Sequence, residues 1–364
     1  MKKVLIGIMQ LHKNAAGAVK TAYEQIRYFK ALGWEVHVMS ALIDKEAVRR
    51  EGAIPHATLN WPGTGRLRRR FYNLQVQWWV RRHRPDLVVG HGDLTQQDVL
   101  VLHNSVHLAH ELIHGKPLPE SSEMWPIHTP QLRERRFRHL IANSNLMRDD
   151  LLKRFGLPPE MATVIYPSYD ERKFTPVGSE ERQRLRKGFG VASHELVVGL
   201  ITSGNFKKRG VDLFFDAFTR LPEELRARTR IWVVGKDKLP PAPAHLRVEQ
   251  MPVRDDVENY FRALDLFVLP ARVEEFGRVQ TEAMACGCPI LSTAQVGASE
   301  LLTGEARDHI LGKADAQALA DHMTRLLSDD ALRARLSALS VSAVLPTAES
   351  QVAARFDQVF KKFL

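Results

Sequence analysis

The chain has 364 residues, with 52 lysines and arginines against 42 aspartates and glutamates, a formal charge of +10, and 44% hydrophobic residues. At roughly 150 residues per domain this length predicts two domains, and the apolar fraction excludes wholesale disorder. No apolar run approaches the roughly 18 residues that a membrane-spanning helix needs, and the opening MKKVLIGIMQ is expected to form a buried strand rather than a signal peptide. Cys286 and Cys288 are too few for a disulfide framework or a zinc site, so a reducing cytoplasm is expected.

Apolar runs alternate with segments of helical spacing along the first half of the chain. Apolar residues from Val19 to Phe29 recur at helical spacing, and Gly33 ends that helix. Strands are expected at residues 4–9, 34–39, 86–90, 99–102, 139–142 and 163–166. Helical segments between several of these strands indicate βαβ units and a parallel sheet.

A second series of elements begins after a break near residues 174–178. Strands are expected at residues 196–202, 231–235, 246–251, 266–270 and 289–293, and helices at 316–327, 330–339 and 348–363. We therefore predict an α/β protein with two doubly wound, Rossmann-like domains facing a central cleft. The first comprises residues 1–172 together with a returning helix at 345–364, and the second comprises residues 173–344. Ligands of such sheets lie beyond the carboxyl ends of the strands, and the cleft is the expected site.

The positive charge is unevenly distributed between the two halves. Residues 1–175 hold 26 basic and 17 acidic residues, a balance of +9, whereas residues 176–364 hold 26 and 25, a balance of +1. This asymmetry indicates different partners for the two domains, with an anionic partner for the first.

The most informative segment is residues 265–290, DLFVLPARVEEFGRVQTEAMACGCPI. It is expected to run from a strand through a loop into a helix, with Glu274 in the loop and Glu282 on the helix. The backbone amides of Gly277 and Arg278 would open that helix, and a helix N-terminus is a favourable place for a phosphate. A carboxylate such as Glu282 can accept hydrogen bonds from vicinal hydroxyls, as on a ribose.

At these residues the sequence resembles the retaining glycosyltransferases of family 4, which have the two-domain GT-B fold. The family pattern is two glutamates separated by seven residues with Phe-Gly between them, here Phe276-Gly277, followed by Glu-Ala-Met-Ala-x-Gly-x-Pro. The resemblance implies that Glu274 acts in catalysis by positioning the donor sugar. It also implies that Phe276, Gly277, Arg278 and Glu282 bind the donor.

A second match lies in the loop SGNFKKRGVD at residues 203–212. The family places a basic residue before the last glycine of this loop, where it reaches the diphosphate of the nucleotide-sugar donor. Here Arg209 takes that place with Lys208 beside it, and the planar guanidinium suits a phosphate. Ser203-Gly204 stand where many members carry an additional arginine.

The first domain carries weaker matches to the family. After the first strand the family has a glycine-rich turn, and here Ala15-Ala16-Gly17 stands in that place, which leaves Gly17 as the donor-binding candidate. The family often has a histidine near the donor sugar, and His103 is the catalytic candidate, with His91 and His107 as competitors.

Arginines flank a predicted amphipathic helix in the basic half, where apolar residues from Leu67 to Trp78 recur at helical spacing. The group expected to face a membrane or the acceptor comprises Arg66, Arg68, Arg69, Arg70, Trp78, Trp79, Arg81 and Arg82. Such a helix can lie on an anionic membrane, but a core-facing helix with a solvated basic face fits the pattern equally. Nucleic acid ranks last because no recognised nucleic-acid module accompanies the charge.

The resemblance implies transfer of a hexose or heptose from a nucleotide-diphosphate sugar, by default a UDP-sugar, to a glycan or glycolipid acceptor. The short domain junction and the FKKRG loop look similar to those of transferases that build the lipopolysaccharide core, which is therefore the expected acceptor. Capsule, exopolysaccharide and glycolipid intermediates stay open. The sequence has no Asp-x-Asp motif, so neither a metal nor another cofactor is expected. The expected location is the cytoplasm, with a peripheral position on the inner face of the cytoplasmic membrane left open.

Proteins of other classes fit less well. A nicotinamide-dependent oxidoreductase would carry Gly-x-Gly-x-x-Gly after the first strand, which LHKNAAGAVKTA lacks. A sugar-nucleotide epimerase of similar architecture is disfavoured by the acid-pair segment. A non-catalytic nucleotide-sugar-binding protein on the same scaffold remains as the alternative.

Overall fold

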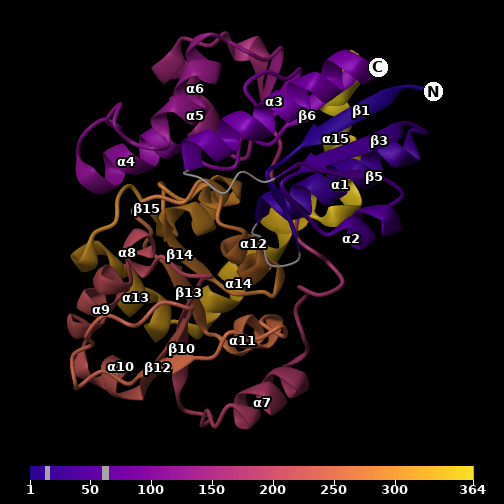
Figure 1. Cartoon of the computed structure of the whole chain (residues 1–364). Coiled ribbons are helices and arrows are strands. Elements are labelled where there is room, and N and C mark those ends of the chain that lie inside the picture. The colour runs from indigo at the N-terminus through magenta and orange to yellow at the C-terminus, as the bar shows by residue number, and fades with distance from the viewer. Residues whose placement is uncertain (13–16, 60–64, 364) are drawn as a thin grey trace. The chain divides into compact units, whose positions relative to one another are not determined.

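The computed structural model describes residues 1–12, 17–59 and 65–363, and they form two compact units (Figure 1). Unit 1 comprises residues 1–167 and 350–364, and unit 2 comprises residues 168–349. The sequence predicts these breaks at 172 and 345, a few residues away in each case. Each unit is a parallel α/β sheet, as the alternation of apolar runs and helical segments predicts.

The described part of unit 1 is built on a seven-stranded parallel sheet of order β5-β3-β1-β6-β7-β8-β9. Its strands are β1 (Lys3–Gly7), β3 (Glu35–Ser40), β5 (Ile54–Ala57), β6 (Leu87–Gly90), β7 (Val99–Val101), β8 (His139–Ala142) and β9 (Ala162–Val164), and β2 (Gln10–Leu11) pairs with β4 (Leu42–Ile43). Its helices are α1 (Gly17–Ala31), α2 (Lys45–Arg50), α3 (Gly65–His83), α4 (Val106–His114), α5 (Trp125–Arg133), α6 (Asn145–Phe155) and α15 (Val352–Phe360).

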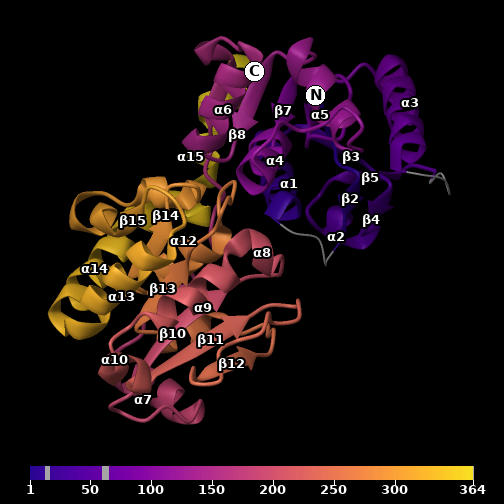
Figure 2. The ribbon, with the colours of Figure 1, turned by 90° about the vertical axis from the view of Figure 1, so that its left-hand side faces the viewer.

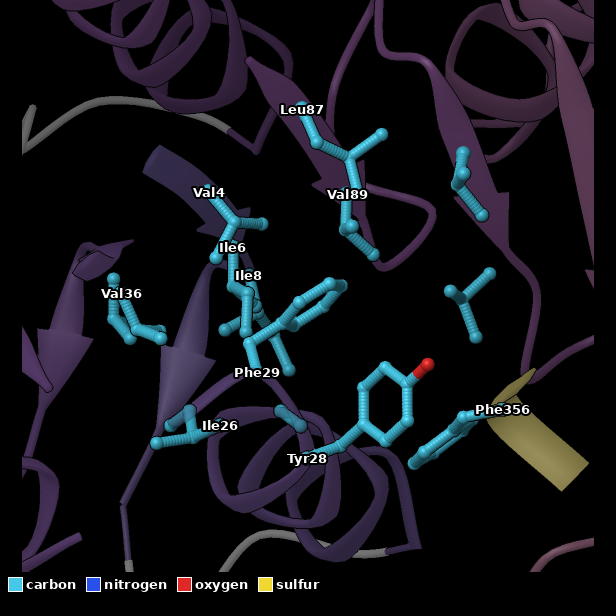
Figure 3. Close-up of a cluster of buried hydrophobic side chains, with 14 of the residues drawn as sticks. Val4, Ile6, Ile8, Ile26, Tyr28, Phe29, Val36, Leu87, Val89 and Phe356 are labelled. Carbon is cyan, nitrogen blue, oxygen red and sulfur yellow. The ribbon is translucent and has the colours of Figure 1, made fainter. Parts of the chain in front are cut away.

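Alternation along β1 assigns the helices of unit 1 to the two faces of its sheet. Val4 and Ile6 point into a core that contains Phe29 of α1 and Phe356 of α15 (Figure 3). Leu5 lies between them in sequence and packs into a second core with Tyr72, Val76 and Trp79 of α3. Because successive strand residues face opposite sides, α1 and α15 cover one face and α3 covers the other.

The described part of unit 2 is built on a six-stranded parallel sheet of order β12-β11-β10-β13-β14-β15. Its strands are β10 (Leu196–Ile201), β11 (Thr229–Val234), β12 (Val248–Met251), β13 (Leu266–Leu269), β14 (Ile290–Thr293) and β15 (Ile310–Leu311). Its helices are α7 (Ser179–Gly188), α8 (Phe206–Arg209), α9 (Val211–Thr219), α10 (Glu223–Arg228), α11 (Glu258–Ala263), α12 (Arg278–Ala285), α13 (Ala316–Ser328) and α14 (Asp330–Val344). β10 and β13 are buried along their whole length, which explains their continuous apolar sequence.

Strand order reverses once in each sheet. In unit 1 the chain runs from β1 outward through β3 to β5 and then returns to β6 on the other side of β1. In unit 2 it runs from β10 through β11 to β12 and returns to β13 on the other side of β10. The carboxyl ends of the two strands at such a reversal are the usual ligand-binding position of a doubly wound sheet. The loops after β1 and β6, and after β10 and β13, are therefore the segments to examine.

Candidate active site

The two loops with the strongest sequence motifs follow the two strands at the reversal in unit 2. The loop after β10 leads into α8, which carries Lys208 and Arg209, and the loop after β13 carries Glu274. β10 and β13 pair directly, with Val198 beside Leu266. The fold thus brings together two motifs that lie about 65 residues apart in the chain, counted from Arg209 to Glu274.

Gly210 sets how closely these two loops approach. It has φ 72°, in the left-handed region that favours glycine. A Cβ atom on Gly210 would stand 2.2 Å from the carbonyl oxygen of Pro270, the first residue after β13. Backbone therefore packs on backbone here, and only glycine leaves room for it.

Two ion pairs join the loops. Arg209 Nη2 lies 2.5 Å from Glu274 Oε2, and Lys208 Nζ lies 2.6 Å from Glu275 Oε2. All four side chains are at least five-sixths buried, with Glu275 7% exposed and Arg209 16% exposed. Pairing compensates the desolvation of four charges that would otherwise be costly to bury. The basic and acidic residues of the candidate site are thus held against each other before any ligand arrives.

Glu274 is fixed by its backbone as well as by Arg209. Its amide donates to the carbonyl of Gln295 at 2.8 Å, and its carbonyl accepts from the amide of Gly297 at 3.0 Å. Burial raises the pKa of Glu274, and the charges of Arg209 and Lys208 oppose that rise only partly. The carboxylate of Glu274 therefore has a fixed position, and its pKa depends on the charges of Arg209 and Lys208.

The residues after Glu274 lead into α12 as the sequence motif predicts. Phe276 is 3% exposed, and Gly277 precedes α12 with φ 93°. α12 begins at Arg278, whose Nη1 donates to the carbonyl of Ser168 at 2.7 Å, so its guanidinium is engaged with unit 2 itself. Glu282 lies half-buried in the middle of α12. The amide groups at the start of α12 remain the feature suited to a phosphate.

In unit 1 the catalytic candidate His103 lies just after β7 and contacts a second histidine. Its Nε2 is 2.9 Å from His91 Nδ1, and His91 Nε2 is 3.0 Å from Gln25 Oε1 on α1. Burial, and then the neighbouring His103, hold the pKa of His91 well below its ordinary value, so this ring is neutral at pH 7. With Gln25 Oε1 as acceptor, His91 donates from Nε2 and its Nδ1 accepts from His103 Nε2. His91, named from sequence as a competitor, therefore orients His103, and His107 instead contacts Thr129.

The other candidates of unit 1 are placed as follows. Gly17 is the first residue of α1, and Ala15 and Ala16 lie outside the described residues. Along α3, Leu67, Leu74 and Trp78 are 52%, 61% and 63% exposed, so this stripe does not face the core. Trp79 must be removed from the predicted surface group, because it is 5% exposed in the core with Tyr72 and Val76. Arg66, Arg70, Arg81 and Arg82 are exposed, whereas Arg68 and Arg69 are half-buried.

Glu275 and Asp237 of the unit 2 site are not singled out by the sequence motifs, and Gly210 enters the motif only as the last glycine of its loop. Glu275 pairs with Lys208, Gly210 permits the loop approach, and Asp237 accepts from the amide of Phe206 at 3.1 Å at the start of α8. Asp237 follows β11, the strand beside β10, so its role depends on strand order. Glu275 is next to Glu274 in the sequence, just as Lys208 is next to Arg209. Two adjacent acids and two adjacent bases are the sequence feature that could have indicated the second ion pair.

The fold is that of the GT-B glycosyltransferases. A crystal structure of WaaG, a glycosyltransferase involved in lipopolysaccharide biosynthesis, matches with a TM-score of 0.76 at 21% identity and covers 98% of this chain and 99% of that one. HepE of Anabaena, crystallised in complex with UDP-glucose, matches with a TM-score of 0.74 at 18% identity over the whole of both chains.

The chain belongs to the family 4 glycosyltransferases. The model "Glycosyltransferase Family 4" matches residues 15–173, and the model "Glycosyl transferases group 1" matches residues 197–329. The resemblance found in the sequence motifs is thereby confirmed for both units. No helix of the described residues is long and apolar enough to cross a membrane.

Curated relatives of several named activities match parts of the chain. A probable transglycosylase of Burkholderia thailandensis is 26% identical over 73% of this chain and 71% of its own. D-inositol 3-phosphate glycosyltransferase of Xylanimonas cellulosilytica is 30% identical over 55% of this chain and 51% of its own. Lipopolysaccharide glucosyltransferase WaaG of Escherichia coli is 32% identical over 41% of both chains. The matching part therefore spans about half the length of the Xylanimonas relative and less than half of the Escherichia coli relative.

Proposed function

We propose that this protein is a retaining glycosyltransferase that moves a hexose or heptose from a nucleotide-diphosphate sugar to a glycan or glycolipid acceptor. The observation that carries the proposal is the buried Arg209–Glu274 pair at the strand reversal of unit 2. This pair combines a phosphate-binding cation with a carboxylate on the family motif, at the position where a doubly wound sheet binds ligands.

The donor is assigned to unit 2, by default as a UDP-sugar, since HepE of the same fold was crystallised with UDP-glucose. Lys208 and Arg209 would meet the diphosphate, and the amides of Gly277 and Arg278 at the start of α12 would add to that charge stabilisation. Phe276 is buried and keeps its assignment to the donor-binding group, while Glu282 would accept hydrogen bonds from the ribose hydroxyls. Gly17, at the start of α1, is the donor-binding residue that we assign to unit 1.

The reaction follows from these roles. The bond between the anomeric carbon and the diphosphate oxygen breaks while a new bond to the acceptor oxygen forms on the same face of the sugar. The acceptor proton passes to the departing diphosphate, whose negative charge is met by Lys208 and Arg209. Glu274 would hold the donor sugar, His103 is the catalytic residue that we assign to unit 1, and no metal is required for charge stabilisation.

For the acceptor we favour the lipopolysaccharide core. WaaG of Escherichia coli, which shares 32% identity over the matching part, is named a lipopolysaccharide glucosyltransferase. Relatives named for inositol phosphate match at similar identity, so capsule, exopolysaccharide, glycolipid and phosphorylated polyol acceptors are the alternatives to be tested.

We further propose that α3 lies on an anionic membrane surface. Leu67, Leu74 and Trp78 form an exposed apolar stripe, bordered by Arg70 and Arg81 on one side and Arg82 on the other. An exposed apolar stripe between arginines is the pattern of an interfacial helix. It would place a cytoplasmic enzyme on the inner face of the cytoplasmic membrane.

The deciding experiment combines donor binding with transfer. Thermal unfolding in UDP, GDP and ADP identifies the nucleotide, since a ligand that binds only the folded protein raises its stability. Transfer from the corresponding sugar is then measured with and without EDTA. Glu282→Gln should mainly raise the donor KM, and Glu274→Ala should lower kcat by roughly a hundredfold or more. The matched variant Glu223→Ala, exposed on α10, should behave as wild type.

The same assay separates the catalytic proposal from its alternative. A non-catalytic nucleotide-sugar-binding protein would show nucleotide-dependent stabilisation but no transfer with any acceptor. Wild-type turnover in both Glu274→Ala and Glu282→Gln would overturn the site assignment, and inhibition by EDTA would overturn metal independence.

A further inference from the structure

Unit 1 contains a cavity of about 370 Å³ between α3, the loop after β6 and the start of α5. This volume is within the range of small-molecule sites. One wall is a single face of α3, on which Arg66, Arg69, Arg70, Asn73 and Gln77 recur at three- and four-residue spacing. Figure 2 shows α3 at the outer margin of unit 1. None of the glycosyltransferase motifs covers this cavity.

The charge of the cavity is strongly positive. Among the described residues, three arginines and one carboxylate, that of Asp93, line the cavity. Both oxygens of this carboxylate already have partners within the protein. Asp93 Oδ1 pairs with Arg69 Nη1, and Asp93 Oδ2 accepts from the amide of Met9 at 2.8 Å. Three arginines against one aspartate leave an excess of two positive charges, which favours an anion.

The guanidinium groups at this wall have unused donors. Among the residues that the structure describes, Nε of Arg69 is buried without a hydrogen-bond partner. Arg66 Nη2 donates to the carbonyls of Ser121 and Ser122 over long distances of 3.4 Å each. The exposed guanidinium groups of Arg66 and Arg70 on the same wall can donate to an anion with several acceptor oxygens.

The remaining lining of the cavity is largely apolar. Leu94, Pro126 and Ile127 contribute apolar surface, and Thr95 adds a hydroxyl. Leu74 stands at the mouth and is 61% exposed, so the cavity opens onto the apolar stripe of α3. A cationic wall opposite an apolar wall fits an anionic group attached to an organic body.

The position of the cavity in the fold agrees with a substrate site. Asp93, Leu94 and Thr95 follow β6, and Met9 follows β1, the two strands at the reversal of the unit 1 sheet. The carboxyl ends of these strands are where a doubly wound sheet binds ligands.

We propose that this cavity binds the phosphate of a phosphorylated acceptor, with Arg66, Arg69 and Arg70 contacting the phosphate oxygens. That the phosphate belongs to an acceptor rests on the proposed transferase function. Binding of a phosphate in this cavity does not depend on that function. Arg69, held by Asp93, supplies a pre-oriented donor, and the apolar wall contacts the sugar or lipid portion beside the phosphate.

The test compares direct binding in the full-length chain. Glucose 6-phosphate, with glucose as the uncharged probe, is titrated calorimetrically into wild type and the double variant Arg66→Gln/Arg70→Gln. Arg49→Gln/Arg50→Gln removes the same charge from exposed sites on α2 of the same unit. Lys208→Gln/Arg209→Gln removes the cations of the donor loop. Loss of two charge-assisted hydrogen bonds predicts about tenfold or greater weakening in the first variant and near wild-type binding in the other two.

A second arm identifies the source of the phosphate. Flotation with phosphatidylcholine vesicles, with and without phosphatidic acid, detects a lipid headgroup, and calorimetry with glucose 6-phosphate detects a soluble one. Weaker glucose 6-phosphate binding by Arg66→Gln/Arg70→Gln supports the cavity. Because Arg70 also borders the exposed stripe of α3, weaker flotation supports it only where the loss is greater with phosphatidic acid than with phosphatidylglycerol at the same surface charge. Equal weakening by Arg49→Gln/Arg50→Gln, or wild-type binding by the cavity variant in both assays, overturns it. If no nucleotide sugar supports transfer while the cavity variant still loses glucose 6-phosphate, the transferase proposal fails and the phosphate site stands.

Discussion

Burial and neighbouring positive charges shift the pKa of Glu274 in opposite directions. Burial raises its pKa, while Arg209 and Lys208 lower it without cancelling the rise. A carboxyl whose pKa is raised by folding binds its proton more tightly in the folded state, so stability declines as pH rises through its titration range. The protein retains this arrangement at a cost in stability, which is the usual behaviour of a site selected for function.

Removing the positive charge of Arg209 should therefore shift the acidic limb of activity. In Arg209→Met the pKa of Glu274 rises further, because its largest charge partner is lost, and a smaller fraction is ionised at a given pH. We expect the acidic limb of the kcat–pH profile, measured at saturating donor, to move to higher pH. Arg209→Lys keeps the charge and should keep the limb near its wild-type position. Identical limbs in the two variants would contradict the role of Arg209.

His91 offers a second test at this scale, because it contacts His103, the residue proposed to act in catalysis. His91→Phe removes the Nδ1 acceptor that orients His103, and kcat should fall by about tenfold with the donor KM unchanged. His91→Asn places an oxygen or nitrogen near the position of Nδ1 and should recover part of the loss. Equal kcat in both variants would show that His91 only fills space.

Gly210 separates backbone strain from steric clash. Gly210→Ala meets both a positive φ and the Pro270 carbonyl, whereas Gly190→Ala meets only a positive φ of 68° with no atom within 4 Å of the new Cβ. We expect Gly190→Ala to lower the free energy of unfolding by about 1 kcal/mol, and Gly210→Ala by roughly 1–3 kcal/mol more. Denaturant titration measures both, and equal losses would mean that the loops can separate freely.

At the scale of elements, α3 presents three different faces. Tyr72, Val76 and Trp79 bury one face against the sheet, the arginine face lines the cavity, and Leu67, Leu74 and Trp78 form the exposed stripe. Two apolar stripes on one helix explain why its sequence pattern is ambiguous. Helical periodicity detects a stripe, but it does not say which stripe meets the sheet.

The exposed stripe should control membrane association. Leu67→Ser/Trp78→Ser removes two of its three strongly exposed apolar side chains and should weaken binding to vesicles containing phosphatidylglycerol by roughly tenfold or more. Leu339→Ser, on an exposed position of α14, is the matched surface change and should leave binding intact. Vesicle flotation measures this binding. Unchanged flotation of the double variant would contradict the proposal that α3 lies on a membrane surface.

Much of the fold could be predicted because buried parallel strands are continuous apolar runs. β8 has the predicted bounds, and β10 and β13 differ by one residue at their ends. β5 escaped prediction because it is an edge strand of four residues that contains Pro55, and β15 because it has two residues. The candidate residues of the donor loops follow from their motif, but the pairing of Lys208 with Glu275 depends on strand order and could not be read from it.

At the scale of the whole molecule, α15 packs into the core of unit 1 although it follows unit 2 in the sequence. Tyr28 donates to Asp357 Oδ1 at 2.7 Å, and Phe29 packs edge-on against Phe360 with ring centroids 4.8 Å apart. Figure 3 shows Tyr28 and Phe356 meeting in this core. The first and last helices of unit 1 are therefore one packing unit, although more than 300 residues separate Tyr28 from Asp357.

This arrangement predicts which part of the molecule Phe360 stabilises. Phe360 is fully buried, so Phe360→Ala should lower the free energy of unfolding of unit 1 by about 3–5 kcal/mol. Leu112→Ala, at a 41% exposed position on α4 of the same unit, should change it by less than about 0.5 kcal/mol. On the proposed assignment of UDP to unit 2, and with the two units unfolding separately, UDP should raise the stability of unit 2 alone. Calorimetric unfolding with and without UDP should therefore show the Phe360→Ala loss in the transition that UDP does not shift. A comparable loss in the UDP-shifted transition would instead show that the two units unfold as one.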